Sequence, residues 1–166
     1  MARKTTTQGT MLPSVLDRLI DREPANRNEP QSWRAQSMKE LKDSVRRDLE
    51  WLLNTRRPPI EPPESARELW QSVYCYGLPD TTGLSLRSTD DRKRLATVVE
   101  LAIAAFEPRL THVKVSVPAT APATRVVRFQ IEAMLRTEPA PERVYFDTKL
   151  ELASGEYAVE GEARAR

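Results

Sequence analysis

Cysteine, histidine and glycine are scarce in this chain, which has one cysteine, one histidine and five glycines in 166 residues. The single cysteine, Cys75, excludes an internal disulfide and a cysteine-based zinc site, and it favours a reducing compartment. We interpret Cys75, which lies among aromatic residues in VYCYG, as a small core residue. The chain also lacks the glycine-rich patterns G-x-x-x-x-G-K-[ST] and G-x-G-x-x-G, which excludes the common phosphate-binding loops.

The chain has neither a strong excess of one charge nor a long hydrophobic run. Its 26 basic and 24 acidic residues give a formal charge of +2, which argues against a nucleic-acid partner because such proteins concentrate basic residues. No stretch approaches the roughly 18 apolar residues that a membrane span requires. The N-terminal residues do not read as a signal peptide. We therefore expect a cytoplasmic protein without direct membrane insertion.

Residue types that usually carry catalysis are few or isolated. His112, the only histidine, is expected on the polar face of a strand, and nothing near it in sequence suggests a catalytic triad. Carboxylates are plentiful, but most fall on predicted helix faces or in loops. We predict no catalytic residue, no metal site, no cofactor and no small-molecule substrate, and hence no enzymatic activity.

The first 30 residues are expected to form an N-terminal arm. MLPSVLDRLID carries apolar residues at helical spacing after Pro13, which predicts a short amphipathic helix. The stretch REPANRNEPQSW then breaks the pattern with two prolines and two asparagines. Two alternatives stay open, a helix packed on its own domain and a partner-binding arm. Residues 31–166 are expected to form a single domain.

Three helices are predicted in the first half of that domain. Ser37 and Glu40 make an S-x-x-E capping box at the start of a helix over 37–54. A second box, Ser65 with Glu68, predicts a helix over 64–76 that ends at Gly77. The third helix runs from about 89 to 106. Its predicted core face consists of Leu95, Val98, Val99, Ala102, Ile103 and Phe106.

The second half changes to a period of two, which is typical of half-buried strands. Strands are predicted over 111–117, over 127–135 and over 143–152, separated by proline-rich breaks, and a tight turn with a short final strand is predicted in SGEYAVEG. For the third strand we predict one inward face, formed by Val144, Phe146, Leu150 and Leu152. The order of elements predicts an α+β fold, with N-terminal helices packed on a small antiparallel β-sheet formed by the C-terminal half.

The end of the third helix carries an unexpected charged pair. Glu107 lies in the last turn, where the helix dipole disfavours a carboxylate, and Pro108 then ends the helix. Arg109 follows, and Leu110 is expected to reach back to the core. Two interpretations stay open: Glu107 and Arg109 contact a partner, or Glu107 forms an internal salt bridge to Arg46 or Arg47 that holds helix to sheet.

Four segments occur in an order that resembles a known family. They are LPSVLDRL, SVRRDLEWLLNTRR, YGLPD and FEPRL, followed by a three-segment β tail, and together they span about residues 11–160. The chain resembles the type VI secretion system baseplate subunit TssE, within the wider family of small phage-tail wedge proteins. The resemblance implies that residues 31–166 are a baseplate-wedge domain. It also implies that Glu107, Pro108, Arg109 and Leu110 form the contact region.

The resemblance implies a structural role with protein partners. Such a subunit binds other baseplate wedge subunits and contractile sheath proteins, and it helps to initiate sheath assembly. A free edge strand, either residues 113–117 or the final strand, is expected to accept a strand from a sheath subunit. Some family members carry a lysozyme label, so a peptidoglycan-cleaving hydrolase is the alternative. A generic adaptor unrelated to secretion is a third interpretation.

Overall fold

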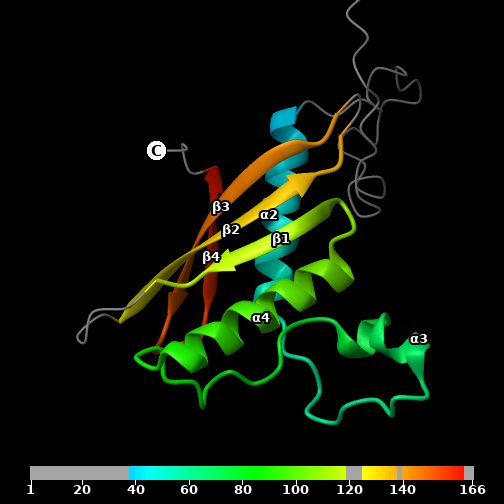
Figure 1. Cartoon of the computed structure of the whole chain (residues 1–166), viewed down its shortest axis with the longest axis vertical. Helices are drawn as coiled ribbons and strands as arrows, with labels where there is room; N and C mark the ends of the chain where they lie inside the picture. Colours follow the sequence, from blue (N-terminus) through cyan, green and yellow to red (C-terminus); the bar gives the residue numbers. More distant parts are fainter. Residues whose placement is uncertain (1–37, 119–124, 138–139, 163–166) are drawn as a thin grey trace, which may run out of the picture.

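The computed structural model describes residues 38–118, 125–137 and 140–162. The predicted arm at 1–30, its helix and the capping residue Ser37 lie outside the described residues. Within them the order of elements is α2 (Met38–Asn54), α3 (Arg67–Trp70), the 3₁₀ turn η2 (Val73–Cys75), α4 (Thr89–Phe106), β1 (Leu110–Ser116), β2 (Val126–Leu135), β3 (Glu142–Glu151) and β4 (Tyr157–Glu162). The predicted α+β fold is confirmed (Figure 1).

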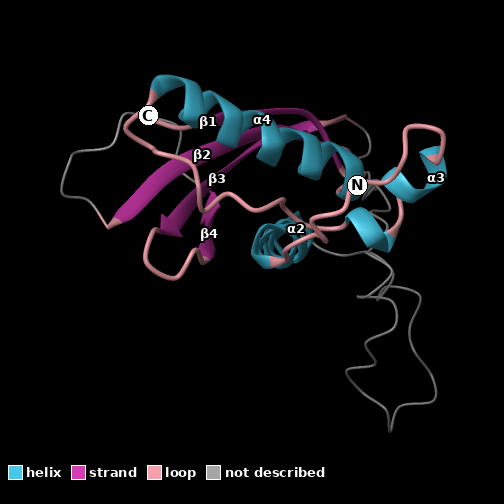
Figure 2. Ribbon diagram, turned by 90° about the horizontal axis from the view of Figure 1, so that it is seen from below, coloured by secondary structure: helices cyan, strands magenta, loops and turns pink. Residues whose placement is uncertain are grey.

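The four strands form one antiparallel sheet in the order β1-β2-β3-β4, so β1 and β4 are its edges. In Figure 2, α4 lies near β1, and α2, which is seen end-on, lies near β4. Side chains of alternate strand residues point toward the helices and close a common core with them. Its largest fully buried members are Leu41, Leu49, Leu52, Leu53, Leu78, Leu95, Ile103, Ile131, Leu135, Val45, Val99 and Val127.

The opposite face of the sheet is polar and is crossed by pairs between neighbouring strands. Arg143 contacts Glu132 at 3.3 Å, and Lys149 pairs with Glu160. Gln130 donates to Asp147 at 3.3 Å. Because exposed pairs of this kind contribute little each, the stability of the sheet comes mainly from its helix-covered face.

The predicted helix over 64–76 is wrong in extent. The chain forms only the single turn α3 and then η2, and Ala66 caps α3 without a side-chain bond, so the Ser65–Glu68 box does not form. Ser72 causes the interruption: its hydroxyl donates to the Leu69 carbonyl at 2.8 Å and accepts from the Tyr74 amide at 3.2 Å. A serine that bonds the local backbone in this way competes with the helical ladder.

Two details of the strands differ from the predicted pattern. Leu152 follows the end of β3 and is 47% exposed, so it does not share the inward face of Val144 and Phe146. Thr148 takes an inward position instead and is fully buried. His112 is exposed on β1, as predicted, but it lies in a break of the β1–β2 register with a φ of 53°.

Candidate partner-binding site

The α4–β1 junction (residues 107–110) is a tight turn that follows from its sequence. The Glu107 amide still donates to Ile103 at 2.8 Å, which completes the last helical bond of α4. Pro108 has no amide hydrogen and ends the helix, and the Leu110 amide then donates to the Glu107 carbonyl at 3.0 Å. The Arg109 carbonyl accepts from the Arg136 amide at 2.8 Å, which fixes the turn to the end of β2.

The Arg109 guanidinium is the centre of an ion-pair cluster that joins this junction to α2. Its Nε donates to Glu107 Oε1 at 2.7 Å, and its Nη2 donates to Glu107 Oε2 and to Asp48 Oδ2, both at 2.5 Å. Its Nη1 donates to the Ser44 hydroxyl at 2.9 Å. Four of its five N–H groups therefore have partners within the molecule. We call Ser44, Asp48, Glu107 and Arg109 the junction cluster.

The junction cluster is largely removed from water. Glu107 is 4% exposed and Ser44 5%, and the Arg109 side chain is 16% exposed. Burial by itself lowers the pKa of Arg109, but the hydrogen bonds and charges of Glu107 and Asp48 outweigh it and raise that pKa above its ordinary value. The cluster is thus a buried, charge-assisted network in which each charge has an opposite partner.

Tyr76 borders the junction cluster from the segment between α2 and α4. Its ring packs edge-on against Phe106 with centroids 5.4 Å apart. Burial, followed by the nearby charges of Asp48 and Glu107, raises the pKa of the Tyr76 phenol. The cluster therefore joins α2 to the turn after α4, and its charges also act on Tyr76 in the segment between α2 and α4.

The four residues predicted as the contact region differ in what they offer a partner. Glu107 and Leu110 are buried, Arg109 is half-buried, and Pro108 is exposed. The internal interpretation had named Arg46 or Arg47 as the link to α2. In the structure Arg46 approaches Glu50 and Arg47 bonds Asp48, while the link from the junction to α2 runs through Arg109 to Asp48 and Ser44.

Sequence reasoning missed Ser44 and Asp48. Both lie on α2 next to the buried residues Val45 and Leu49. They are four residues apart, so they share one helix face. That spacing is a weak signal, because polar residues at the border of an apolar stripe are usually solvated. The signal becomes specific only when the structure brings Arg109 opposite them.

The rim of the junction is apolar and accessible. Leu101, 65% exposed, lies on α4 two turns before Pro108, and Ala104 and Ala105 between them are also exposed. On α2, Trp51 is 50% exposed and Arg47 stacks over its ring at 5.1 Å. Exposed apolar and aromatic side chains of this kind are common at protein contacts.

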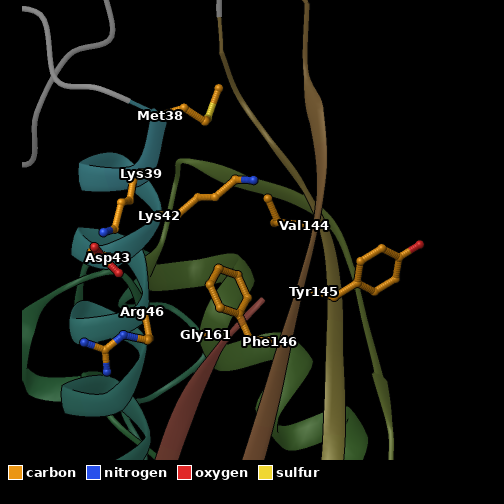
Figure 3. A pocket seen from close by; sticks show the side chains of 9 residues that line it. All are labelled: Met38, Lys39, Lys42, Asp43, Arg46, Val144, Tyr145, Phe146 and Gly161. Atoms are coloured by element: carbon orange, nitrogen blue, oxygen red, sulfur yellow. The ribbon is translucent and has the colours of Figure 1, made fainter. Parts of the chain in front are cut away.

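A groove of about 360 Å³ lies between the N-terminal half of α2 and the strands β3 and β4 (Figure 3). Lys39, Lys42 and Arg46 line it, with Val144 and Phe146 on the sheet side. Lys42 binds Glu142 at 2.7 Å, and Arg46 donates to the Val159 carbonyl at 3.3 Å. These contacts make the groove part of the joint between helix and sheet.

Within the described residues, no group of three or more His, Cys, Asp or Glu side chains is arranged to hold a metal ion. None of the helices in these ranges has the length and apolarity to span a membrane.

Comparison with known proteins gives one family. The model described as baseplate wedge protein gp25 matches residues 39–140, which is more than half of the chain and includes the whole junction cluster. Comparisons with curated proteins and with solved structures give no match.

Proposed function

This chain belongs to the baseplate wedge protein gp25 family, and we propose that it is a structural baseplate subunit of a type VI secretion system. Proteins of this family are structural components of the baseplates of contractile tails. In the proposed role the chain binds other wedge components and helps to initiate assembly of the contractile sheath. It would act in the cytoplasm, at the inner face of the cytoplasmic membrane. The family match is the observation that carries this proposal.

The α4–β1 junction is the proposed contact region for a wedge partner. Pro108 and the remaining N–H group of Arg109 touch the partner, while Glu107 and Leu110 hold the turn in position from inside. The exposed rim around Leu101 adds apolar area to this contact. A turn with so many internal bonds is preorganised, so little conformational entropy is lost when a partner binds.

The sheath contact is proposed at an edge of the sheet, and the two edges differ in how far they are covered. At β4, the Asn54 side chain donates to the Tyr157 carbonyl at 2.7 Å and accepts from the Tyr157 amide at 2.9 Å. Arg46 donates to the Val159 carbonyl on the same edge. Side chains of α2 thus occupy the outward backbone groups of β4, which hinders the addition of another strand.

The β1 edge is more accessible. Its Val115 amide donates to the Glu100 side chain of α4 at 2.7 Å, so an incoming strand has one carboxylate contact to displace. Val113 and Val115 on this strand, and Val117 just after it, are only half-buried. An added strand would cover these side chains and would supply carbonyl acceptors to the edge. We propose that the sheath strand adds at β1.

Val115→Pro tests the edge assignment. Proline removes the amide hydrogen of residue 115, which points away from β2 and bonds the Glu100 side chain. Its loss therefore leaves the hydrogen bonds between β1 and β2 intact. We expect the variant to fold and to co-purify with wedge components, but to stop sheath assembly, observed as fluorescent sheath structures in cells. Lys114→Ala, on the same strand with its backbone amide unchanged, is the control. Normal sheath assembly with folded Val115→Pro would contradict the β1 proposal.

The family role itself is tested by deletion of the gene and co-purification of the wild-type chain. We expect loss of sheath assembly on deletion and capture of wedge components by the wild type. The hydrolase alternative finds no support in the geometry of Glu107, whose two carboxylate oxygens both accept from Arg109 in a buried site. Cleavage of peptidoglycan by the purified chain, lost in Glu107→Gln, would overturn the structural role.

A further inference from the structure

The two edges of the sheet are covered by side chains in different ways. At β4, the neutral Asn54 side chain bonds both the amide and the carbonyl of Tyr157, and the Arg56 guanidinium lies over the Tyr157 ring at 5.8 Å. At β1, the cover within the described residues is one hydrogen bond, which the Val115 amide donates to Glu100 Oε1 at 2.7 Å. Because one bond is replaced more easily than several, the cover at β1 is the removable one.

Val115 is the centre of the short part of β1 with which another strand can pair. His112 has a φ of 53°, and the β1–β2 register shifts between Thr111 and Lys114, so the strand is irregular before Lys114. From Lys114 to the end of β1 the pairing with β2 is regular. Backbone groups of an antiparallel strand point alternately to its two sides, and in this regular segment the outward amide is that of Val115. Glu100 therefore bonds the donor that an incoming strand needs.

The Glu100 side chain is suited to a bond that protects this donor and can still be exchanged. It comes from α4, which lies near β1 (Figure 2). A carboxylate accepts a stronger hydrogen bond than a neutral group does, so it competes well with single acceptors for the Val115 amide. Because Glu100 is only half-buried, its carboxylate can return to water once the amide is bonded elsewhere. An extended strand offers the amide a carbonyl and adds further main-chain bonds along the same edge.

From this geometry we propose that Glu100 is a latch on the β1 edge: it holds the Val115 amide in the free chain and gives it up only to a partner that presents an extended strand. The proposal rests on the sheath contact proposed above, and it names the residue that regulates that contact. Until a sheath strand replaces the carboxylate, the latch protects the edge from pairing with other exposed strands, which is a general hazard of edge strands.

Glu100→Ala removes the latch and tests the proposal. Hydrogen exchange followed by NMR should show the Val115 amide exchanging at least about tenfold faster than in the wild type, because its acceptor is lost. The affinity for purified contractile sheath protein should rise at least about tenfold, because the incoming strand no longer competes with a charge-assisted bond. Adding Val115→Pro to this variant should abolish the gain, since the donor itself is then missing.

Two further variants make the test quantitative. Glu100→Gln keeps the acceptor oxygen and loses the charge, so its exchange rate and its affinity should lie between those of the wild type and Glu100→Ala. The same graded change is required of Glu100→Gln alone if Glu100→Ala does not fold. Asp90→Ala is the matched control, because Asp90 is an exposed acid in the first turn of the same helix. It should leave both measurements unchanged.

The outcomes separate the latch from the function on which it rests. If neither the wild type nor Glu100→Ala binds sheath protein, the proposed sheath contact fails, and the latch fails with it. If the wild type binds and folded Glu100→Ala binds equally well, or if the Val115 amide exchanges at the same rate in both, only the latch is overturned. It is also overturned if Glu100→Ala gains self-association, measured by sedimentation, without any gain in affinity for sheath protein.

Discussion

The α4–β1 junction buries charged side chains, whereas residues 57–76, here called the lobe, expose apolar ones. At the junction, Glu107 and Arg109 are turned inward and bond each other, and Arg109 also donates to Asp48 and Ser44. In the lobe, Val73 and Ile60 are turned outward, although each could contribute to a core. The two regions adjoin at Tyr76, so one neighbourhood of the molecule contains both arrangements.

The difference shows that whether a side chain is buried depends more on the partners available to it than on whether it is charged or apolar. A charge can be buried where its hydrogen bonds are all met, because the network replaces the water that is lost. Apolar side chains remain exposed where a connection between helices is closed by backbone bonds and no second layer of described residues covers them. An internally paired junction favours rigidity, and an uncovered lobe favours contact with another protein.

Among the substitutions proposed here, loss of the Arg109 guanidinium should lower the free energy of unfolding most. Arg109→Ala leaves Glu107 and Asp48 as two neighbouring carboxylates, one of them buried, without their shared partner. We expect the free energy of unfolding to fall by about 3 kcal/mol, as for other broken buried pairs. Chemical denaturation measures this change.

Arg143→Ala is the control for that measurement. Arg143 also pairs with a glutamate, but its side chain is 62% exposed, so its loss should cost less than about 1 kcal/mol. Equal effects of the two substitutions would show that the junction cluster does not stabilise the fold, and the contrast between junction and lobe would lose its energetic basis.

Gly77→Ala should have the next largest effect, at the base of the lobe. The added Cβ would meet the Thr55 carbonyl, and the positive φ is strained for alanine, so we expect a loss of about 2 kcal/mol. Gly83→Ala, where the added Cβ has nothing within 4 Å, should change stability by less than about 0.5 kcal/mol. If Gly77→Ala is tolerated equally, the base of the lobe is not held closed as described.

The fold could be predicted largely from periodicity. α4 and the alternation along β2 appear in the sequence as apolar residues at helical and strand spacing, because each element buries one face against a common core. The proline-rich breaks correctly separated the strands. A single polar residue caused the main error: Ser72 interrupts the helix predicted over 64–76 through bonds to its own backbone, which apolar spacing does not report.

The site could be predicted only in part. The sequence identified Glu107 and Arg109 because a charged pair around a helix-ending proline is unusual. It could not identify their partners, because Ser44 and Asp48 lie more than sixty residues earlier on α2 and resemble ordinary surface positions. Whether the junction binds a wedge partner stays a prediction; the structure shows that Pro108 is exposed and that Glu107 is buried.

A smaller effect is expected where a buried polar group has no partner. Thr148 is fully buried on β3, and its hydroxyl has no hydrogen bond within the described part of the chain. Thr148→Val should therefore raise the free energy of unfolding by about 1 kcal/mol, in contrast to the junction, where every charge is paired. Thr111→Val is the control: it removes a bond to the Met134 carbonyl and should lower stability slightly. Destabilisation by both would mean that Thr148 has a partner, such as an internal water.

The smallest effect is expected at Tyr76, where the two regions meet. Burial, with the charges of Asp48 and Glu107, raises its pKa above the ordinary 10.0, so the folded protein holds the phenol proton more tightly than the unfolded chain does. This contribution is complete below pH 10 and is lost as pH rises through the raised pKa. Because the ring is half-exposed, the loss should be less than about 1 kcal/mol. Denaturation at increasing pH should show a fall in stability that is smaller in Tyr76→Phe than in the wild type. An identical fall in both proteins would show that the charges of the junction do not affect the ionisation of Tyr76.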